Sequence, residues 1–145
     1  MFPIKKITMD SISEDQFAQI VSIEELSQHQ PYTPEMLQEC ICELHTFACT
    51  RGNEILGFVT VNTDSQYLGG SLYVVNLNVR PDCRRQGIGG KLLETAFCAF
   101  PECHRLSLDV EKENTGAVAL YKKLGFRITD ELSRNGDTDW VMVKE

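Results

Sequence analysis

The sequence has no apolar run long enough to cross a membrane, and residues 1–6 lack the apolar core and cleavage site of a secretory signal. Zinc-ligand spacing is missing among the six cysteines, so no metal is expected. No histidine neighbours Cys83 in the sequence, which argues against a catalytic thiol. We therefore expect a cytoplasmic protein without membrane contact, whose cysteines are reduced thiols, several of them buried and Cys83 accessible in a loop.

Lysine and arginine are absent between Lys6 and Arg51, although acidic residues occur throughout that span. The formal net charge of -7 does not favour nucleic-acid binding. Basic residues gather instead around residues 80–91 and at Lys122 and Lys123. This distribution predicts an anionic ligand at one pole and a cationic one at the other, unless the acidic residues are simply solvated helix faces. The acidic residues of the span are Asp10, Glu14, Asp15, Glu24, Glu25, Glu35, Glu39 and Glu43.

A length of 145 residues, with 42% hydrophobic and 24% charged residues, predicts one domain with a single core over residues 1–145. A capping-box pair, Ser13 with Gln16, and the Thr33–Pro34 pair mark two early helix starts. Apolar periodicity predicts about seven strands at 4–9, 46–50, 55–61, 71–79, 106–111, 126–130 and 140–143, and about four helices at 13–26, 34–41, 90–100 and 115–124.

The order of these elements predicts the fold class, an α/β (α+β) architecture. We expect a mixed, mostly antiparallel central sheet with helices on both faces. The strands at 71–79 and 106–111 each lead into a helix, which implies a parallel pair joined by a right-handed crossover. The strands at 46–61 and at 126–143 are typical of two hairpins, with turns at 51–54 and 134–137.

The stretch between Asn76 and Leu93 is the most informative part of the chain, because a strand, a basic loop and a helix start follow one another there. Glycines in such a loop allow positive φ angles or a close approach to a ligand. The helix start exposes unpaired N–H groups and a partial positive charge. The charged and glycine residues of the loop are Arg84, Arg85, Gly87, Gly89, Gly90 and Lys91. Together they indicate a phosphate or pyrophosphate site.

Leu92 excludes two common phosphate motifs. A dinucleotide-binding fingerprint needs its third glycine at this position, and a P-loop needs serine or threonine after the lysine. The remaining alternatives are another kind of pyrophosphate site and a plain glycine turn with solvated arginines.

The pattern Arg84-x-x-Gly87-x-Gly89 resembles the acyl-coenzyme A loop of the GNAT N-acetyltransferase superfamily. Residues 106–126 resemble the second hallmark of that family: a strand, an asparagine, and a helix that carries Leu-Tyr and ends in Gly-Phe. The resemblance covers nearly the whole chain, most loosely at residues 1–50. Residues 31–34 and the early helix pair resemble the branch of ribosomal-protein alanine and small-amine acetyltransferases. The fold so implied has a splayed parallel strand pair.

The resemblance implies acetyl-CoA (coenzyme A) as a cosubstrate. The backbone groups of Leu77 and Val79 are then expected to pair with the pantetheine arm, and an N–H near Val79 to polarise the thioester carbonyl. One of Arg80, Lys122 and Lys123 is expected to meet the ribose phosphate, with the choice open. The cofactor-binding loop so implied consists of Arg84, Arg85, Gln86, Gly87, Ile88, Gly89 and Gly90.

Two residues of the second hallmark receive roles from the resemblance. Tyr121 matches the tyrosine that protonates the leaving coenzyme A thiolate, and its alternative role is that of an amphipathic core residue. Asn114 matches an asparagine that contacts the cofactor, and it also suits a helix N-cap. The two roles of Asn114 are compatible.

The general base is less well defined by the resemblance. Many relatives place a glutamate on the central strand, which here offers only Asn76 and Asn78. Asp109 is the catalytic candidate; it would reach the amine through water, and the alternative is an exposed strand carboxylate. Glu111 is a reserve on the same face, and an acceptor amine of low pKa would need no base. The three histidines, His29, His45 and His104, have no motif context.

The implied function is an N-acetyltransferase, in which an acceptor amine of a small molecule or peptide N-terminus attacks the thioester directly. The acidic residues between Lys6 and Arg51, a span without lysine or arginine, favour a cationic acceptor. The alternatives are a non-catalytic acyl-CoA-binding or interaction domain and an enzyme that uses another acyl group. A homodimer is a further implication of the resemblance, and neither nucleic acid nor membrane is an expected partner.

Overall fold

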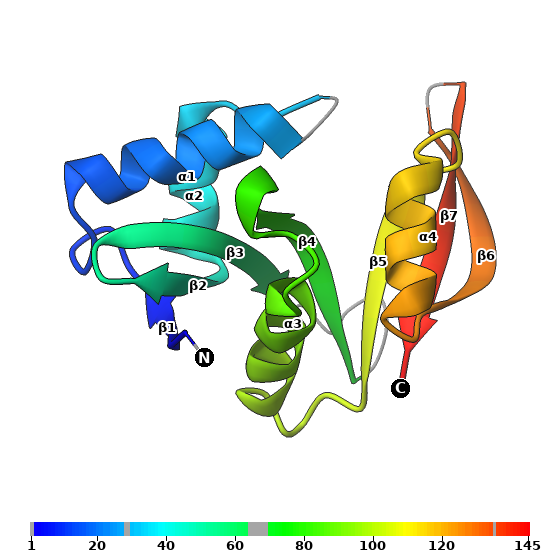
Figure 1. Cartoon of the computed structure of the whole chain (residues 1–145). Coiled ribbons are helices and arrows are strands. Elements are labelled where there is room, and N and C mark those ends of the chain that lie inside the picture. Colours follow the sequence, from blue (N-terminus) through cyan, green and yellow to red (C-terminus); the bar gives the residue numbers. More distant parts are fainter. Residues whose placement is uncertain (1, 28–29, 64–69, 135) are drawn as a thin grey trace. The chain divides into compact units, whose positions relative to one another are not determined.

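We describe the fold from a computed structural model of the chain, which covers residues 2–27, 30–63, 70–134 and 136–145 (Figure 1). Parts of the predicted connections at 28–32, 63–70 and 134–137 lie outside these described residues, as does His29. Within the described part, no helix is both long enough and apolar enough to span a membrane.

The described strands form one sheet in the order β1-β2-β3-β4-β5-β7-β6. The pairs β1–β2, β2–β3, β5–β7 and β6–β7 are antiparallel, whereas β4 and β5 run parallel. The predicted mixed, mostly antiparallel sheet with a parallel pair is therefore confirmed. The elements in chain order are β1 (Ile4–Ile7), α1 (Glu14–Ser27), α2 (Pro34–Glu43), β2 (His45–Arg51), β3 (Glu54–Asn62), β4 (Ser71–Val79), the 3-10 turn η1 (Pro81–Cys83), α3 (Ile88–Cys98), β5 (Arg105–Glu111), α4 (Thr115–Lys123), β6 (Arg127–Arg134) and β7 (Asp137–Lys144).

The chain divides into two compact units, which we describe separately. Unit 1 contains residues 1–62 and 75–99, and unit 2 contains residues 63–74 and 100–145. Unit 1 therefore holds the end of β4 and the glycine-rich loop, and unit 2 holds the start of β4 and the second hallmark.

Both early helices of unit 1 begin at the predicted caps. The Ser13 hydroxyl accepts a bond from the Gln16 N–H at 3.0 Å, and the Gln16 side chain accepts one from the Ser13 N–H at 3.0 Å. The Thr33 hydroxyl accepts a bond from the Met36 N–H at 3.2 Å, with Pro34 at the first position of α2. Local sequence chemistry thus defines where α1 and α2 start.

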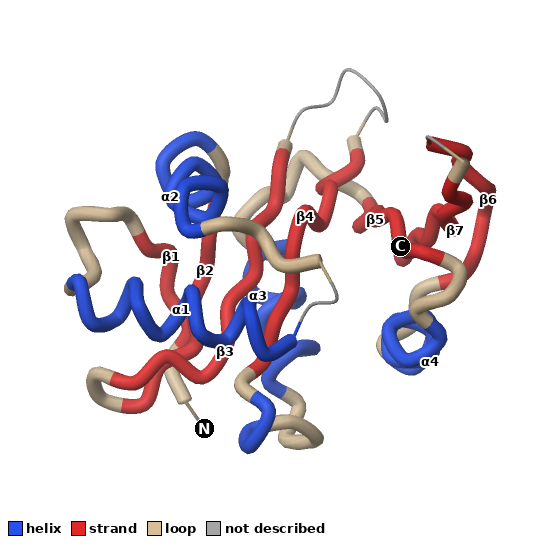
Figure 2. The backbone as a smooth tube through the Cα atoms, turned by 90° about the horizontal axis from the view of Figure 1, so that it is seen from above, coloured by secondary structure: helices blue, strands red, loops and turns tan. Residues whose placement is uncertain are grey.

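The core of unit 1 lies between α1, α2 and strands β1 to β3, and Figure 2 shows α1 crossing β3, on which it packs. Side chains of β4 alternate between two faces. Asn76 and Asn78 point toward α1, whereas Leu77 and Val79 point toward Gly89 of α3. The helices α1 and α3 therefore lie on opposite faces of β4. The buried core residues are Ile7, Ile20, Ile23, Leu37, Ile41, Ala48, Ile55 and Phe58.

Unit 2 is built on a β6–β7 hairpin that is longer than predicted. The sequence predicts strands at 126–130 and 140–143, whereas the ladder extends to Arg134 and Asp137. The extra pairs are mostly polar, and backbone pairing at the edge of a sheet needs no apolar side chains. Lys112 adds support across the strands, because its ammonium lies 2.7 Å from the Glu131 carboxylate and 4.0 Å from the centre of the Trp140 ring.

Gly57 of β3 is a point of close backbone approach in unit 1. A methyl group at this position would lie 2.9 Å from the Asn78 carbonyl oxygen and 3.3 Å from Leu92 Cδ1. We expect Gly57→Ala to lower the free energy of unfolding by about 1–3 kcal/mol, because the backbone of β4 must move to accommodate the new atom. Chemical denaturation measures this change.

Gly116→Ala is the matched control for Gly57→Ala. Gly116 lies in α4, and a methyl group there meets no atom within 4 Å. Alanine favours a helix by up to about 1 kcal/mol over glycine, so stability should hold or rise. A Gly57→Ala variant as stable as wild type would contradict the close approach of β3 and β4.

Candidate active site

The glycine-rich loop of unit 1 connects the end of β4 to a helix without a side-chain cap. The Arg80 N–H donates to the Leu56 carbonyl at 2.8 Å, which fixes the end of β4 on β3. The first backbone bond of α3 runs from the Lys91 N–H to the Gly87 carbonyl at 3.0 Å, and Gly87 provides no side-chain cap. The N–H groups of residues 88–90 therefore precede the first helical bond and remain available to an anion. The helix starts two residues earlier than predicted, at Ile88, whose side chain is buried.

The backbone of the loop turns through two left-handed residues. Arg85 has φ = 65° and Gly87 has φ = 79°, and Arg85 is the one described non-glycine residue with positive φ. A left-handed conformation is disfavoured by roughly 1–2 kcal/mol for a side chain other than glycine. Successive N–H groups in such turns form concave anion sites. The loop geometry thus agrees with the predicted pyrophosphate site.

Two arginines near the loop are bonded to protein groups. The Arg84 guanidinium donates to the Val79 carbonyl at 3.2 Å and to the Ser27 hydroxyl at 3.1 Å, so it joins the loop to β4 and α1. The Arg80 guanidinium donates to the Asp82 carboxylate at 2.6 and 3.1 Å, and this pairing raises the pKa of Arg80. Arg84 therefore has a structural contact beside the cofactor role that the motif implies.

The expectation of an accessible Cys83 is wrong. The 3-10 turn packs this side chain inward, and only 4% of its surface is exposed. The buried thiol of Cys49 lies close enough that Cys83 adds to the rise in the pKa of Cys49, which burial mainly causes. The six cysteines are all free thiols, and four of them are buried. Burial in apolar surroundings makes such thiols unreactive.

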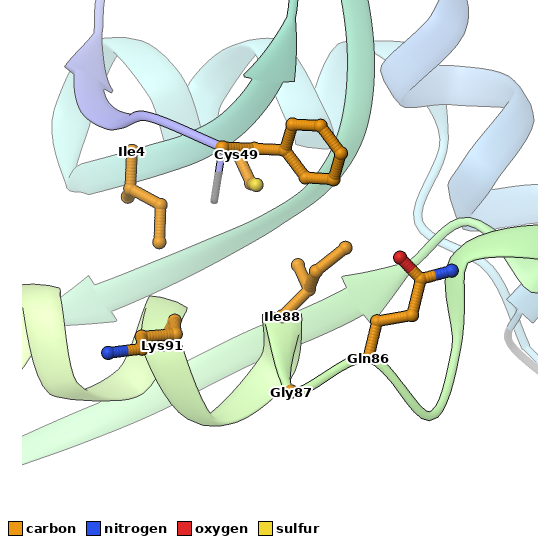
Figure 3. Close-up of a pocket in the computed structure, with 7 residues that line it drawn as sticks. Ile4, Cys49, Gln86, Gly87, Ile88 and Lys91 are labelled. Carbon is orange, nitrogen blue, oxygen red and sulfur yellow. The ribbon is translucent and has the colours of Figure 1, made fainter.

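A cavity of about 260 Å³ adjoins the start of α3 (Figure 3). Figure 3 shows Ile88 between Lys91 and Gln86, with Ile4 and Cys49 across the hollow. Phe2 and Ile4 of the N-terminal segment therefore line the same cavity as residues of the loop. Sequence spacing does not reveal this proximity. The lining residues are Phe2, Ile4, Cys49, Gln86, Gly87, Ile88 and Lys91.

A buried carboxylate lies against β4, although no acidic residue belongs to that strand. Glu24 of α1 is fully buried, and it accepts bonds from the amides of Asn76 at 2.6 Å and Asn78 at 2.7 Å. The Tyr32 N–H donates to the same carboxylate at 2.9 Å. Sequence reasoning missed this residue. The available signal was its spacing, since Glu24 follows Ile20 by four residues and so falls on the apolar face of α1.

Tyr121 of α4 is half-buried in unit 2. Its ring packs edge-on against Phe126, with ring centres 5.4 Å apart, and burial raises the pKa of Tyr121 to about 12. The phenol is therefore protonated at every ordinary pH. The predicted capping role of Asn114 is confirmed, because its side chain accepts a bond from the Ala117 N–H at 3.2 Å.

Asp109 of β5 is half-buried and has a partner that the sequence analysis did not identify. The Tyr73 hydroxyl donates to the Asp109 carboxylate at 2.9 Å. The β4–β5 register runs from Ser71–Arg105 to Tyr73–Ser107, so this side-chain bond lies at the end of the parallel ladder. Glu111, the reserve candidate, is exposed. Of the described histidines, His45 has its pKa lowered mainly by burial and also by Lys6.

The structure brings the predicted residues together within two groups. In unit 1, the end of β4 with Leu77 and Val79 leads directly into the loop of residues 84–90. In unit 2, Asp109 lies on β5, Asn114 caps the start of α4, and Tyr121 lies on that helix. Lys122 and Lys123 occupy the last turn of the same helix. The described residues contain no cluster of three or more metal-ligating side chains.

A family model described as Acetyltransferase (GNAT) family matches residues 12–126. The chain belongs to the GNAT acetyltransferase family. Its fold is similar to that of a crystal structure of the ribosomal-protein-S18-alanine N-acetyltransferase from Escherichia coli. That structure is 22% identical, has a TM-score of 0.76, and is matched over 99% of this chain and 93% of that chain.

Two relatives show the range of proteins to which this GNAT chain is similar. A probable spermine N(1)-acetyltransferase of Bacillus subtilis subsp. natto is 25% identical over 152 residues, which cover 96% of this chain and 98% of that protein. The peptidyl-lysine N-acetyltransferase YjaB of Salmonella typhimurium is 45% identical over 53 residues. That match spans 37% of this chain and only 34% of the length of the Salmonella protein.

The two loop glycines should differ in their tolerance of alanine. We expect Gly87→Ala to weaken acetyl-CoA binding about tenfold, because the left-handed turn that orients the N–H groups is strained by a side chain. Isothermal titration calorimetry measures the affinity. Gly89→Ala is the control, since its methyl group would lie 3.8 Å from Val79 Cγ2, an ordinary contact. Equal affinities for the two variants would contradict this account of the loop.

Proposed function

We propose that this chain is an acetyl-CoA-dependent N-acetyltransferase. The observation that carries the proposal is the start of α3 without a side-chain cap, behind a loop with two left-handed residues, in a chain of the GNAT family. Residues 85–90 present their backbone N–H groups to the diphosphate of coenzyme A. The backbone of Leu77 and Val79 pairs with the pantetheine arm, as the family resemblance implies. The two relatives named above are both described as N-acetyltransferases, which agrees with the proposal.

The reaction is direct attack of a neutral amine on the thioester carbonyl carbon. The new C–N bond forms as the C–S bond breaks, and the electron pair leaves with the sulfur of coenzyme A. A backbone N–H near Val79 stabilises the negative charge that develops on the carbonyl oxygen. The attacking nitrogen gives up one proton to water or, through water, to Asp109, whose carboxylate the Tyr73 hydroxyl orients.

Tyr121 acts as the proton donor to the leaving sulfur. Burial raises the pKa of Tyr121 to about 12, so the phenol carries its proton throughout the working range. A phenol of raised pKa is a weaker acid, so the transfer depends on a hydrogen bond between the Tyr121 hydroxyl and the sulfur as the C–S bond breaks. Asn114 caps α4, the helix that carries this tyrosine, and so supports its position.

The acceptor is a cationic amine, either a polyamine-like small molecule or a basic peptide. This part of the proposal rests on the absence of lysine and arginine between Lys6 and Arg51 and on the acidic residues of α1 and α2. A negative surface attracts and orients a cationic acceptor, and salt weakens that attraction. The spermine and peptidyl-lysine acetyltransferases named above are compatible with such acceptors.

An amine panel tests the proposed function. Acetyl transfer should be at least about tenfold faster in kcat/KM for spermine-like and lysine-containing acceptors than for anionic amines, and the difference should shrink as salt rises. Thiol release from acetyl-CoA measures the rate, and a reaction without amine is the control. A preference for anionic acceptors would contradict the acceptor class. If acetyl-CoA binds but no amine of the panel raises thiol release above the reaction without amine, a non-catalytic binding domain is favoured.

Tyr121→Phe tests the proton donor. We expect kcat to fall about 10²–10⁴-fold while the affinity for acetyl-CoA and the melting temperature stay close to wild type, because the ring keeps its contact with Phe126. In the wild type, no loss of kcat from Tyr121 should occur below about pH 11, since its pKa is raised and the protonated form persists. Unchanged turnover in the variant would show that another group protonates the thiolate.

A further inference from the structure

Glu24 is a buried charged residue that the proposed chemistry does not use. Its carboxylate is inaccessible to solvent, and three N–H donors surround it: Asn76 Nδ2, Asn78 Nδ2 and the Tyr32 backbone. The Asn78 amide also donates to the Asn76 side-chain oxygen at 3.0 Å. Asn76 and Asn78 are themselves 8% and 3% exposed.

The negative charge of Glu24 has no cationic partner among the residues that the structure describes, because none of the ion pairs found there includes it. Its field reaches neighbouring groups. Burial is the main cause of the raised pKa of Tyr32 and of Cys40, and the charge of Glu24 contributes to both. A buried carboxylate is costly to desolvate, so it depends strongly on each N–H donor that bonds it.

The network joins three segments of unit 1 that are distant in sequence. Glu24 belongs to α1, Tyr32 to the connection between α1 and α2, and Asn76 and Asn78 to β4. The two asparagines flank Leu77, whose backbone is proposed to pair with the pantetheine arm. The other face of the strand packs toward α3 through Leu77 and Val79. One carboxylate therefore fixes the α1–α2 connection to the strand proposed to carry the thioester.

We propose that Glu24 is a positioning residue for the acceptor amine, an inference that rests on the proposed function. Its carboxylate reaches β4 from helix α1. It holds the Tyr32 segment and the β4 asparagines in one arrangement, and that arrangement sets the approach of the amine to the thioester. The end of β4 is also held by the Arg80–Leu56 backbone bond and by the packing of Leu77 and Val79 toward Gly89 of α3. The hydrogen bonds of the network run between α1, Tyr32 and β4 rather than to the N–H groups of residues 85–90, so we expect cofactor binding to depend little on Glu24.

Glu24→Gln removes the charge and preserves the shape of the side chain. Asn76 and Asn78 donate to one carboxylate oxygen and the Tyr32 N–H donates to the other. When the remaining oxygen keeps the two asparagine bonds, the new NH₂ group faces the Tyr32 N–H, and that bond is lost. We expect kcat/KM for the amine to fall at least about tenfold, mainly through a higher acceptor KM, and acetyl-CoA affinity to stay within about twofold of wild type. Glu25→Gln is the matched control, because Glu25 is the exposed neighbour and loses the same charge.

A second substitution separates positioning from general stability. When Glu24→Gln is combined with Asn78→Asp, the carboxylate moves to the strand. The new side-chain amide at position 24 then donates to that carboxylate, and its oxygen accepts from the Tyr32 N–H. The Asn76 amide turns over, so that it donates to the carboxylate at position 78 and accepts from the amide at position 24. We expect this double variant to recover acceptor KM. Amide hydrogen exchange at Tyr32 should rise in the single variant and fall again in the double variant, a readout that does not depend on activity.

The outcomes distinguish the inference from the proposed function. If the wild type transfers acetyl groups and Glu24→Gln lowers only the melting temperature, with kinetic constants equal to those of Glu25→Gln, then Glu24 is merely structural and the inference is overturned. A loss of acetyl-CoA affinity equal to the loss in kcat/KM would also overturn it. If the wild type acetylates no amine in the panel, the proposed function fails and the inference fails with it.

Discussion

Unpaired N–H groups at the start of α3 are the feature on which the proposed cofactor site and its chemistry depend. A helix start in contact with water normally uses a serine, threonine or asparagine cap, as α2 and α4 do here. The start of α3 has Gly87 instead, preceded by a left-handed Arg85. Gly87 has no side chain to accept hydrogen bonds from the first N–H groups of the helix, and a diphosphate can accept them instead. The chemistry proposed for the chain follows from the ligand that binds there.

The end of β4 that leads into the loop is held by contacts within unit 1. The Arg80 N–H bonds the Leu56 carbonyl of β3, and Gly57 lets the two strands approach closely. Leu77 and Val79 pack toward α3 on one face of β4, and these contacts support the backbone at the start of the loop. On the other face, the buried Glu24 carboxylate joins the strand to α1 and to Tyr32.

Much of this arrangement could be predicted from short-range signals. The capping box at Ser13, the Thr33 cap and the strand–loop–helix order around Gly87 depend on neighbouring residues, and the structure confirms all three. Features that depend on distant partners could not be predicted. Glu24 bonds residues more than fifty positions away, and the burial of Cys83 follows from tertiary packing.

The candidate site was predictable to a similar degree. The motifs identify the loop and Tyr121, but not the Tyr73 hydroxyl that bonds Asp109, because strand register decides that contact. The full length of the β6–β7 hairpin could not be predicted either, since its outer pairs are polar. Sequence periodicity detects the apolar part of a strand, whereas the ladder continues wherever backbone groups can pair.

Diphosphate binding by the N–H groups of residues 85–90 is tested most directly by an amide-resolved NMR titration of the chain with coenzyme A, with pantetheine as the ligand that lacks the diphosphate. Coenzyme A should produce the largest shifts at the amides of residues 85–90, and pantetheine should leave those amides unmoved. Unperturbed amides at residues 85–90 in the presence of saturating coenzyme A, or equal shifts with both ligands, would contradict diphosphate binding at this loop.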